Sequence, residues 1–562
     1  MEKISQSIDK IKKSYDVVIV GSGYGGSISA SRLARAGMKV CLLERGKEFL
    51  PTEFPETLKA TSKETQYDFA DKKKGNNDAL FDFRVNDEQS VLVGCGLGGT
   101  SLINANVVLK PHKEVFTNGQ WPAEIVDDME NGVKDGYRRA WEMFGPNAYP
   151  NIKQLYKANA HFKSASTIEG AEVSFAPLNV TFTDRVNKAG VKQEACNNCG
   201  NCCSGCNTTA KNTTQMNYLP DAYNHSAQIF TGVKVYSIKK DNNKWNVYYY
   251  PTNTNQDDIE DVLTCVQADI VIISAGTLGT TEILLRSRNF GLPLSDNLGF
   301  GFSGNADFLG IAYNTNTKIN GLGYLKNSLN DTTYCGPNIT TLIDNRNDVK
   351  NYQDGICIEE GSIPVALAEG RLLPFSLLFA KMLIGRETFS DIFAEKYRTL
   401  KSLLLGSYHG AVNQTQIYLA MGHDGSDGRM YLENDRLRIS WEGLGEKEIF
   451  KKINESLLKC TKALHGNYIQ DPVWVKLFKN ALVTVHPLGG SRMADTSRDG
   501  VVNHRSEAFS GNDAHSIHEG LYVMDGSMIP TSLGTNPLFT ISAITERNCK
   551  LLVEKYNRPF ID

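Results

Sequence analysis

A glycine-rich turn directly after an apolar run near the N-terminus limits the fold of this chain most strongly. Residues 15–20 are nearly all apolar, and Gly21, Gly23 and Gly26 follow in the spacing Gly-x-Gly-x-x-Gly. In a turn from strand to helix, the first glycine permits the tight turn, the second lets a phosphate approach the backbone, and the third lets helix and strand pack closely. The sequence therefore predicts an α/β nucleotide-binding unit, in which the free amides at the helix start face a pyrophosphate.

The residues after the turn complete this unit. A helix is expected over 27–36 and a second strand over 39–43, which ends in Glu44. An acidic residue at this place can bond the ribose hydroxyls of a dinucleotide. Glu44 is therefore a candidate cofactor ligand, together with Tyr24 and Gly25 inside the turn.

Further segments have the same α/β character. A glycine-rich loop lies within apolar flanks at 91–109, and an apolar run at 270–273 leads through a glycine into a helix that ends near residue 286. Between them, residues 229–250 alternate apolar and polar positions around a polar turn, which is typical of a β-hairpin. Residues 520–554 predict a short strand, an Asp-Gly turn and a closing helix.

Charge and hydropathy exclude several classes of protein. The net charge of −3 argues against nucleic acid as the main partner. No stretch has the roughly 20 apolar residues of a transmembrane helix. The most apolar stretch, residues 372–384, predicts a core or substrate-covering helix, and shallow membrane contact is the alternative.

The N-terminal segment lacks the features of an export signal. Ile4, Ile8 and Ile11 have the spacing of an amphipathic surface helix over residues 1–14, with lysines between them. A long apolar region and a cleavage site are missing, so a cytoplasmic location is expected. Docking of this segment to a partner or a membrane stays open.

Five of the twelve cysteines fall within eleven residues, which indicates a metal site rather than a disulfide framework. The candidate ligands are Cys196, Cys199, Cys202, Cys203 and Cys206. Their spacing is that of a ferredoxin-type run and predicts a [4Fe-4S] or [3Fe-4S] iron–sulfur cluster. Zinc and plain thiols are the alternatives, because the proline usual after the fourth cysteine is Asn207 here.

Two polar residues near the C-terminus have the chemistry of alcohol oxidation. His486 begins a His-Pro-Leu-Gly-Gly run, and Asn536 follows fifty residues later before a proline. An imidazole can take a hydroxyl proton near neutral pH. An amide can orient the same oxygen through a hydrogen bond. We therefore expect His486 and Asn536 to be catalytic, and a redox cofactor must accept the hydride.

These motifs together resemble the glucose-methanol-choline (GMC) oxidoreductases, and most closely their bacterial cholesterol oxidase-like branch. The resemblance rests on residues 93–106, 274–280 and 521–530 and on the His486 and Asn536 motifs. It implies a discontinuous Rossmann-like FAD-binding domain with an inserted α+β substrate-binding domain. The FAD is expected to be bound non-covalently, because the usual linking histidine is not evident and His112 lies past the glycine loop.

The resemblance also implies domain limits and cofactor contacts. The FAD-binding domain would comprise residues 1–111, 212–310 and 481–562, the substrate-binding domain 112–185 and 311–480, and a cysteine-rich insertion 186–211. Beyond the first turn, the implied FAD-binding residues are Gly94, Gly98, Gly99, Ser101, Asn104, Asn106, Val233, Gly276, Asp525, Gly526, Asn536 and Pro537.

One position departs from the steroid-isomerising members of the family. They carry a glutamate shortly before a strand that resembles residues 417–420, whereas residues 412–416 contain no carboxylate here. The steroid substrate and migration of its double bond are therefore in doubt. Glu359 and Glu360 could substitute, although surface or loop carboxylates are the more common case.

The expected activity is FAD-dependent oxidation of a hydrophobic alcohol, sterol-like or long-chain, to a carbonyl. His486 and Asn536 would act on the hydroxyl group, and an iron–sulfur cluster would pass electrons to an acceptor protein or quinone. A peroxide-forming oxidase, a desaturase or isomerase, and a non-catalytic electron carrier are the alternatives.

Overall fold

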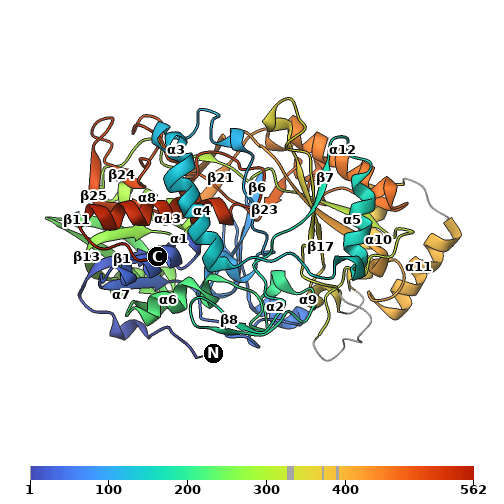
Figure 1. The fold of residues 1–562 in the computed structure, drawn as a ribbon, viewed down its shortest axis with the longest axis horizontal. Coiled ribbons are helices and arrows are strands. Elements are labelled where there is room, and N and C mark those ends of the chain that lie inside the picture. Colours follow the sequence, from blue (N-terminus) through green and yellow to red (C-terminus); the bar gives the residue numbers. More distant parts are fainter. Residues whose placement is uncertain (1, 326–334, 370–371, 388–391) are drawn as a thin grey trace.

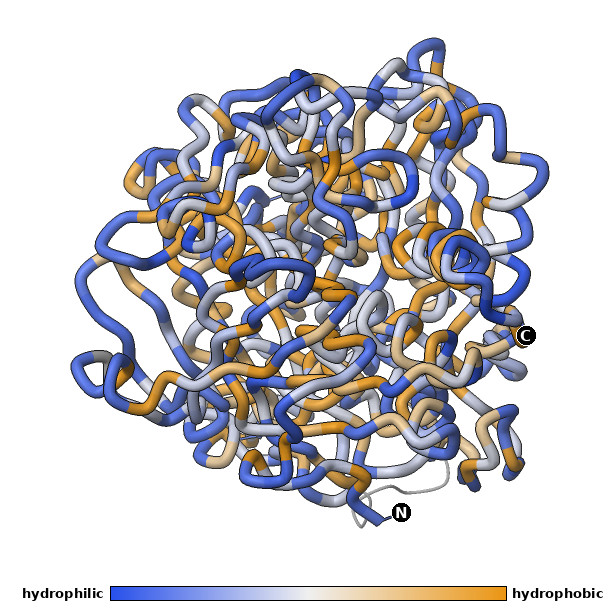
Figure 2. The backbone as a smooth tube through the Cα atoms, turned by 90° about the vertical axis from the view of Figure 1, so that its left-hand side faces the viewer, coloured by the Kyte–Doolittle hydropathy of each residue, from blue (hydrophilic) through white to orange (hydrophobic). Residues whose placement is uncertain are grey.

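The structure, a computed structural model, describes residues 2–325, 335–369, 372–387 and 392–562. Two large sheets with their covering helices lie beside each other along the longest axis of the molecule (Figure 1). Hydrophobic segments run mainly through the interior, and hydrophilic segments gather at the periphery (Figure 2). One of these sheets therefore lies toward each end of the molecule.

The first sheet is built on five parallel strands in the order β10-β2-β1-β13-β25. These strands are β1 (Ser14–Val20), β2 (Val40–Glu44), β10 (Gln228–Thr231), β13 (Thr264–Ile273) and β25 (Ile517–Val523). Their apolar runs suit parallel strands that are covered on both faces. The parallel core confirms the predicted α/β fold.

An antiparallel hairpin extends this sheet, with β11 (Val233–Asp241) and β12 (Lys244–Pro251) following β13. The hairpin starts later than the sequence predicts, because residues 228–231 form β10 and pair with β2 instead. Gly232, with a φ of 72°, separates the two strands. The short strand β24 (Glu507–Phe509) pairs with β25.

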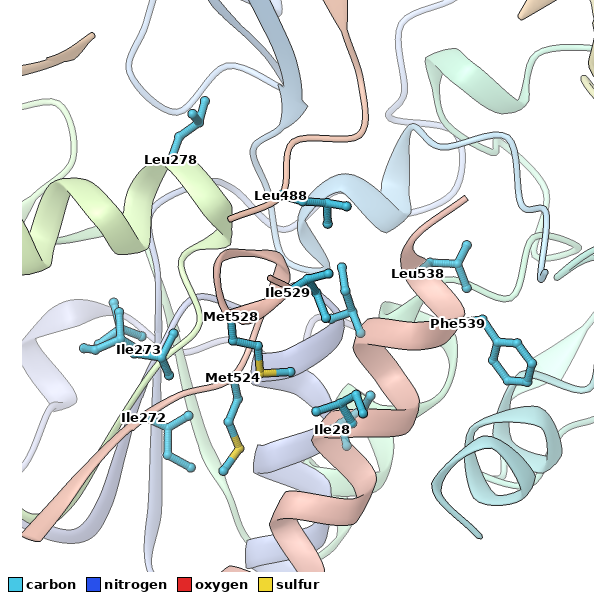
Figure 3. Close-up of a cluster of buried hydrophobic side chains, with 14 of the residues drawn as sticks. Ile28, Ile272, Ile273, Leu278, Leu488, Met524, Met528, Ile529, Leu538 and Phe539 are labelled. Carbon is cyan, nitrogen blue, oxygen red and sulfur yellow. The ribbon is translucent and has the colours of Figure 1, made fainter. Parts of the chain in front are cut away.

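Helices cover the faces of the parallel core. They are α1 (Tyr24–Arg35), α4 (Lys134–Phe144), α6 (Tyr218–Asn224), α8 (Gly276–Asn289) and α13 (Leu538–Lys555). Ile28 of α1 packs with Met524 and with residues of α13 in one apolar cluster (Figure 3). Beside it, Arg32 of α1 forms a buried ion pair with Glu546 of α13 at 2.8 Å. The last helix is thus fixed against the first.

The second sheet has seven strands, in the order β18-β22-β15-β19-β17-β16-β7. The strands are β7 (Glu172–Phe175), β15 (Phe308–Tyr313), β16 (Thr341–Asp344), β17 (Cys357–Gly361), β18 (Gly385–Arg386), β19 (Gln416–Met421) and β22 (Asn467–Ile469). Helices α5 (Tyr156–Ala165) and α12 (Glu448–Ala463) pack on it. Alternate side chains therefore point toward these helices or away from them.

A smaller five-stranded sheet brings two functional loops together. In it, β23 (Leu482–Thr484) runs parallel to β6 (Gln89–Gly94). The glycine loop follows β6 and His486 follows β23. Because parallel strands end at the same edge, these two segments meet.

The remaining elements are short or peripheral. They are α2 (Leu58–Lys63), α3 (Ala123–Asp127), α7 (Ile259–Val262), α9 (Val365–Ala368), β3 (Thr65–Asp68), β4 (Lys73–Lys74), β5 (Phe81–Arg84), β8 (Arg185–Val186), β9 (Lys192–Gln193), β14 (Phe300–Phe302), β20 (Gly428–Glu433) and β21 (Arg436–Ser440).

One local prediction is wrong, and a second is wrong in one of its alternatives. Over the described residues 2–14, only Ile8–Lys10 is helical, as one 3₁₀ turn, and Gln6 bridges to Phe230. Edge pairing to the sheet replaces the expected amphipathic helix. Helices α10 (Leu372–Ile384) and α11 (Ile392–Leu405) form as a pair, but α10 is not a core helix, because among its residues only Pro374 and Leu377 are buried.

Candidate active site

A cavity of about 460 Å³ is lined by residues from both large sheets. One part of its wall comes from the turn after β1, the loop after β6, and the segments after β13 and β25. Another part comes from β15, β17 and β19 of the antiparallel sheet. Its volume lies in the range of cofactor and substrate sites.

The first glycine turn is shaped to hold a phosphate group. A Cβ at Gly26 would lie 2.0 Å from the carbonyl oxygen of Gly21, so this glycine permits close packing of helix and strand. A Cβ at Gly23 would have no protein atom within 4 Å, and Gly23 lines the cavity. The space in front of Gly23 is therefore left open by the protein and suits the pyrophosphate of a dinucleotide at the start of α1.

Glu44 lies at the end of β2 in the cavity wall. Its Oε2 accepts hydrogen bonds from the amide (3.1 Å) and hydroxyl (2.6 Å) of Ser22, and its Oε1 accepts one from the Gly46 amide at 2.8 Å. These bonds fix the carboxylate, and its remaining lone pairs are available to ribose hydroxyls. Nearby, Asn104 donates to the Tyr24 hydroxyl at 2.6 Å, which joins the two cofactor loops.

Most residues predicted to bind the cofactor line the cavity. These are Gly21, Gly23, Tyr24, Gly25, Glu44, Gly94, Gly99, Asn104, Asn106, Val233, Gly276, Asp525, Gly526, Asn536 and Pro537. Three others lie behind the wall: Gly26, Gly98 and Ser101. Gly26 packs on the turn, and Ser101 donates to the Gly98 carbonyl at 2.6 Å, so these three shape the loops instead of facing the cavity.

A buried ionic cluster in the cavity wall was not predicted. Arg84 of β5 binds Asp82 at 2.9 Å and Glu282 of α8 at 3.3 Å, and Arg45 binds Asp82 at 2.6 Å. All four residues line the cavity, as does Val233. The cluster links the first sheet to the small one, and its members are too far apart in sequence to form a recognisable motif.

His486 is held by a carboxylate. Its Nδ1 hydrogen-bonds Asp307 at 2.8 Å, which leaves Nε2 as the ring nitrogen available to a ligand in the cavity. The other oxygen of Asp307 accepts from the Val485 amide and the Thr484 hydroxyl, both at 2.8 Å. Burial alone would lower the pKa of His486, but the charges of Asp307 and Glu359 and the hydrogen bond to Asp307 raise it above its ordinary value.

Asn536 lies beside a buried glutamate. Its side-chain nitrogen donates to Glu359 of β17 at 3.4 Å, while Asn536 Oδ1 and Glu359 Oε1 have no hydrogen-bond partner among the described residues. Burial raises the pKa of Glu359 to about 8, against the opposing effects of His486 and Asn536. This carboxyl group therefore holds its proton to higher pH than an exposed glutamate. Two buried polar atoms without partners next to His486 indicate a place where a polar ligand atom belongs.

Strand alternation gives Glu359 and its neighbour different surroundings. Glu359 pairs with Leu419, a cavity residue, whereas Glu360 points to the opposite face and binds Lys157 of α5 at 2.8 Å. Both are fully buried, so the expectation of surface or loop carboxylates is wrong. The sequence offered Glu359 only as one of two possible substitutes for the family's glutamate, because strand pairing, not local sequence, brings it to Asn536.

One short segment positions the loops that carry His486 and Asn536. Asn305 Oδ1 accepts from the amides of Leu533 (2.9 Å) and Gly534 (3.0 Å), and Asn305 Nδ2 donates to the Thr535 carbonyl at 2.9 Å. Two residues later, Asp307 holds His486. The polar pair Asn305 and Asp307 thus fixes His486 and the chain leading to Asn536 relative to each other.

The antiparallel sheet makes its part of the cavity apolar. Leu309 of β15 pairs with Leu419 of β19, and Ile417 lies two residues before Leu419 on the same face. All three line the cavity with Ile339. This wall can contact an apolar molecule whose polar end reaches His486.

The cysteine segment does not form a recognisable metal site. Over the chain as described, no group of three or more His, Cys, Asp or Glu residues is arranged to hold a metal ion. Cys203 lines the cavity, and burial raises its pKa to about 12. The prediction of a metal at Cys196, Cys199, Cys202, Cys203 and Cys206 therefore has no support from the described residues.

The glycine turn, the parallel sheet and the polar site together define a dinucleotide-dependent oxidoreductase fold. Family models described as GMC oxidoreductase match residues 15–298 and 448–545, and the chain belongs to this family. GMC oxidoreductases bind FAD, and the protein is an FAD-dependent oxidoreductase.

Known proteins are similar over nearly the whole chain. A cholesterol oxidase of Acinetobacter baumannii is 26% identical over 96% of this chain and 95% of its own length. A long-chain-alcohol oxidase of Arabidopsis thaliana is 23% identical over 95% of this chain and 66% of its own length. The crystal structure of pyridoxine 4-oxidase from Mesorbium loti, 16% identical, matches with a TM-score of 0.60 and covers 96% of this chain and 99% of that chain. This last similarity confirms the fold.

Proposed function

We propose that the protein oxidises the hydroxyl group of a hydrophobic alcohol, sterol-like or long-chain, to a carbonyl group. The observation that carries this proposal is the arrangement of His486, Asn536 and Glu359 beside a cavity with glycine turns on one part of its wall and apolar side chains on another. The names of the cholesterol and long-chain-alcohol oxidases that it resembles support the same substrate class.

The roles of the residues follow from their contacts. FAD, when bound, accepts the hydride from the alcohol carbon. Nε2 of His486 takes the hydroxyl proton, and Asp307 stabilises the imidazolium that results. The Asn536 side-chain nitrogen has a second N–H besides the one directed at Glu359, and it can donate this N–H to the alcohol oxygen, which orients the hydroxyl group. Loss of one hydride and one proton converts the alcohol to the carbonyl product.

We propose domain limits that follow the two sheets. Residues 1–111, 212–310 and 481–562 would bind FAD, and residues 112–185 and 311–480 would bind the alcohol. The strands of the two large sheets fall in these segments, apart from the first residues of β15. The cytoplasmic location stays a prediction.

Replacing His486 by alanine tests the proposal. The variant should bind FAD normally, but its flavin should be reduced by an alcohol at least about 1,000-fold more slowly, because the proton acceptor is lost. The measurement is anaerobic bleaching of the flavin absorbance in a stopped-flow instrument. His112→Ala is the matched control, since His112 lies outside the cavity, and it should leave the rate unchanged. Normal reduction of the flavin in His486→Ala would contradict the proposal.

The electron acceptor is proposed to be dioxygen. The relatives named above are oxidases, and no metal-holding group of side chains is found among the described residues. Dioxygen would take two electrons and two protons from the reduced enzyme and form hydrogen peroxide.

Iron and acid-labile sulfide per flavin, measured on protein purified without oxygen, test this route. We expect neither, together with one hydrogen peroxide per carbonyl formed. Several irons per flavin with matching sulfide would contradict the proposal of dioxygen as acceptor. They would instead favour electron transfer through an iron–sulfur cluster to a protein or quinone acceptor.

A further inference from the structure

Helices α10 and α11 form a projecting pair at one end of the molecule, remote from the first sheet (Figure 1). They pack against each other, and α10 also packs against β22 and β18 of the antiparallel sheet. No role in the cofactor site is assigned to them, since neither helix contributes a residue to the wall of the cavity.

Helix α10 is apolar on two faces. On the inner face, Leu373, Leu377, Ala380 and Ile384 pack into a buried apolar cluster. On the outer face, Leu372, Phe375, Phe379, Met382 and Leu383 are each 55–74% exposed. A helix at an aqueous surface normally has a polar outer face, whereas one that is apolar all round is surrounded by apolar material.

The polar groups of α10 do not give it a hydrated face. The Ser376 hydroxyl donates back to the Leu372 carbonyl at 2.9 Å. Lys381 pairs with Glu395 of α11 at 3.0 Å and with Glu387 at 3.3 Å. These side chains bind other protein groups, so the outer surface remains a continuous apolar stripe.

Helix α11 extends the apolar surface and adds positive charge. Its exposed apolar residues include Ile392, Tyr397, Leu400 and Leu405, each 54–64% exposed. Lys396 and Arg386 are exposed at this end of the molecule, and Lys401 is half-buried. Apolar side chains flanked by basic ones are complementary to a bilayer surface that carries anionic lipids.

The length of α10 suits contact with one leaflet. Its 13 residues extend over about 20 Å, shorter than the roughly 30 Å hydrocarbon core of a bilayer. Within the described part of the chain, no helix is long and apolar enough to cross a membrane. A stripe of this length suits a helix that lies in the plane of the interface.

The inner face of α10 lies close to the cavity wall. The cluster that receives Leu377 also contains Ile363 and the half-buried Ile417, and Ile417 lines the cavity. A bilayer on the outer face of α10 would thus be separated from the substrate space by one apolar layer. A hydrophobic alcohol dissolves in bilayers, so a site beside the membrane has access to it.

We propose that the α10–α11 surface docks onto a bilayer containing anionic lipids and places the alcohol-binding cavity next to the membrane. The docking itself needs no catalysis, and only its link to substrate supply rests on the proposed function. Docking requires the exposed apolar residues of α10 and α11 for insertion into the lipid, and Lys396 and Arg386 for attraction to the anionic headgroups.

Vesicle flotation tests the docking directly. The flavin-containing protein should float with vesicles of phosphatidylcholine and phosphatidylglycerol, and more weakly with phosphatidylcholine alone. The double variant Phe379→Ser/Met382→Ser should partition at least about tenfold more weakly, because two apolar side chains no longer enter the lipid. Phe290→Ser/Val186→Ser is the matched control, with 60% and 62% exposed side chains outside the pair, and should float like the unmodified protein.

Two outcomes would overturn the proposal. One is no flotation of the unmodified protein with either vesicle. The other is a concentration-dependent dimer that the Phe379→Ser/Met382→Ser variant abolishes while flotation stays unchanged, which would assign the surface to a second copy of the chain.

A second readout separates this proposal from the proposed function. Oxidation of a long-chain alcohol held in vesicles should fall in the double variant, whereas oxidation of a short alcohol dissolved in water should not. Flotation without oxidation of any alcohol would keep the membrane surface and reject the proposed reaction. Equal loss of both activities would show damage to the fold and reject the specific effect on substrate supply.

Discussion

Asp307 controls how His486 titrates. Its carboxylate accepts a hydrogen bond from Nδ1 of His486 at 2.8 Å and raises the pKa of the imidazole above the ordinary 6.5. The neutral imidazole that accepts a proton is therefore scarce at low pH and becomes abundant as pH rises through the raised pKa. The rate of flavin reduction should accordingly increase with pH, with its half-maximal point above 6.5.

Asp307→Asn should move this acidic limb to lower pH, because loss of the negative charge lowers the pKa of His486. The maximal rate should also fall by about 100-fold, since the imidazolium formed during reaction loses its partner. The pH dependence of anaerobic flavin reduction is the measurement. An acidic limb that stays in place would show that Asp307 does not act through His486.

At the scale of single residues, the sequence predicts which side chains are reactive better than it predicts which residues lie beside them in space. His486 and Asn536 are recognised from their flanking motifs, and the structure brings both to Glu359. Glu359 itself has no such motif. Its position beside Asn536 depends on the pairing of β17 with β19, which no local pattern encodes.

At the scale of elements, two glycines of the turn between β1 and α1 have different roles, since Gly26 allows close packing and Gly23 leaves space for a ligand. Gly26→Ala puts a methyl group against the Gly21 carbonyl, at 2.0 Å, and should destabilise the protein by about 1–3 kcal/mol. Gly23→Ala meets no protein atom and should leave the apoprotein within about 0.5 kcal/mol of the unmodified protein. Its methyl group would occupy the phosphate space, so its FAD affinity should fall at least about tenfold.

Thermal unfolding of the apoproteins and FAD titration by fluorescence quenching check this pair of variants. Equal FAD affinity in Gly23→Ala and the unmodified protein would contradict the assignment of the turn to the pyrophosphate.

Helices and strands could be predicted where a short stretch of sequence carries their signal. The turn, α1 and β2 follow from glycine spacing and apolar runs. The hydropathy of residues 372–384 predicts a helix, but not which side of it faces solvent, because that depends on how much sheet is available to cover it. The five-cysteine spacing predicts a metal ligand set, and the surrounding fold does not arrange it as one.

At the scale of the whole molecule, a buried charge joins distant parts of the chain. Glu546 of α13 binds Arg32 of α1 at 2.8 Å, accepts from the Tyr218 hydroxyl of α6 at 2.7 Å, and lies 3.3 Å from Arg139 of α4. Glu546 is fully buried. Loss of its charge leaves the buried guanidinium group of Arg32 without a carboxylate partner, whereas Arg139 keeps its ion pair with Asp135.

Glu546→Gln should therefore lower the free energy of unfolding by about 3–5 kcal/mol. Arg138→Gln is the control, because Arg138 forms its ion pairs at the surface, and it should cost at most about 1 kcal/mol. Guanidinium denaturation followed by circular dichroism measures both. Similar small losses in the two variants would show that Glu546 does not anchor the four helices.

The contact between α1 and α13 also affects the time at which the protein becomes functional during its synthesis. Arg32 and Glu546 are 514 positions apart, and β25 and Asn536 are translated late as well. While the ribosome is still making the intervening chain, the glycine turn has emerged but one flank of its sheet and the helix that covers α1 are missing. The nascent protein therefore exposes the apolar face of α1 until translation of α13, and FAD can be captured in its complete site only afterwards.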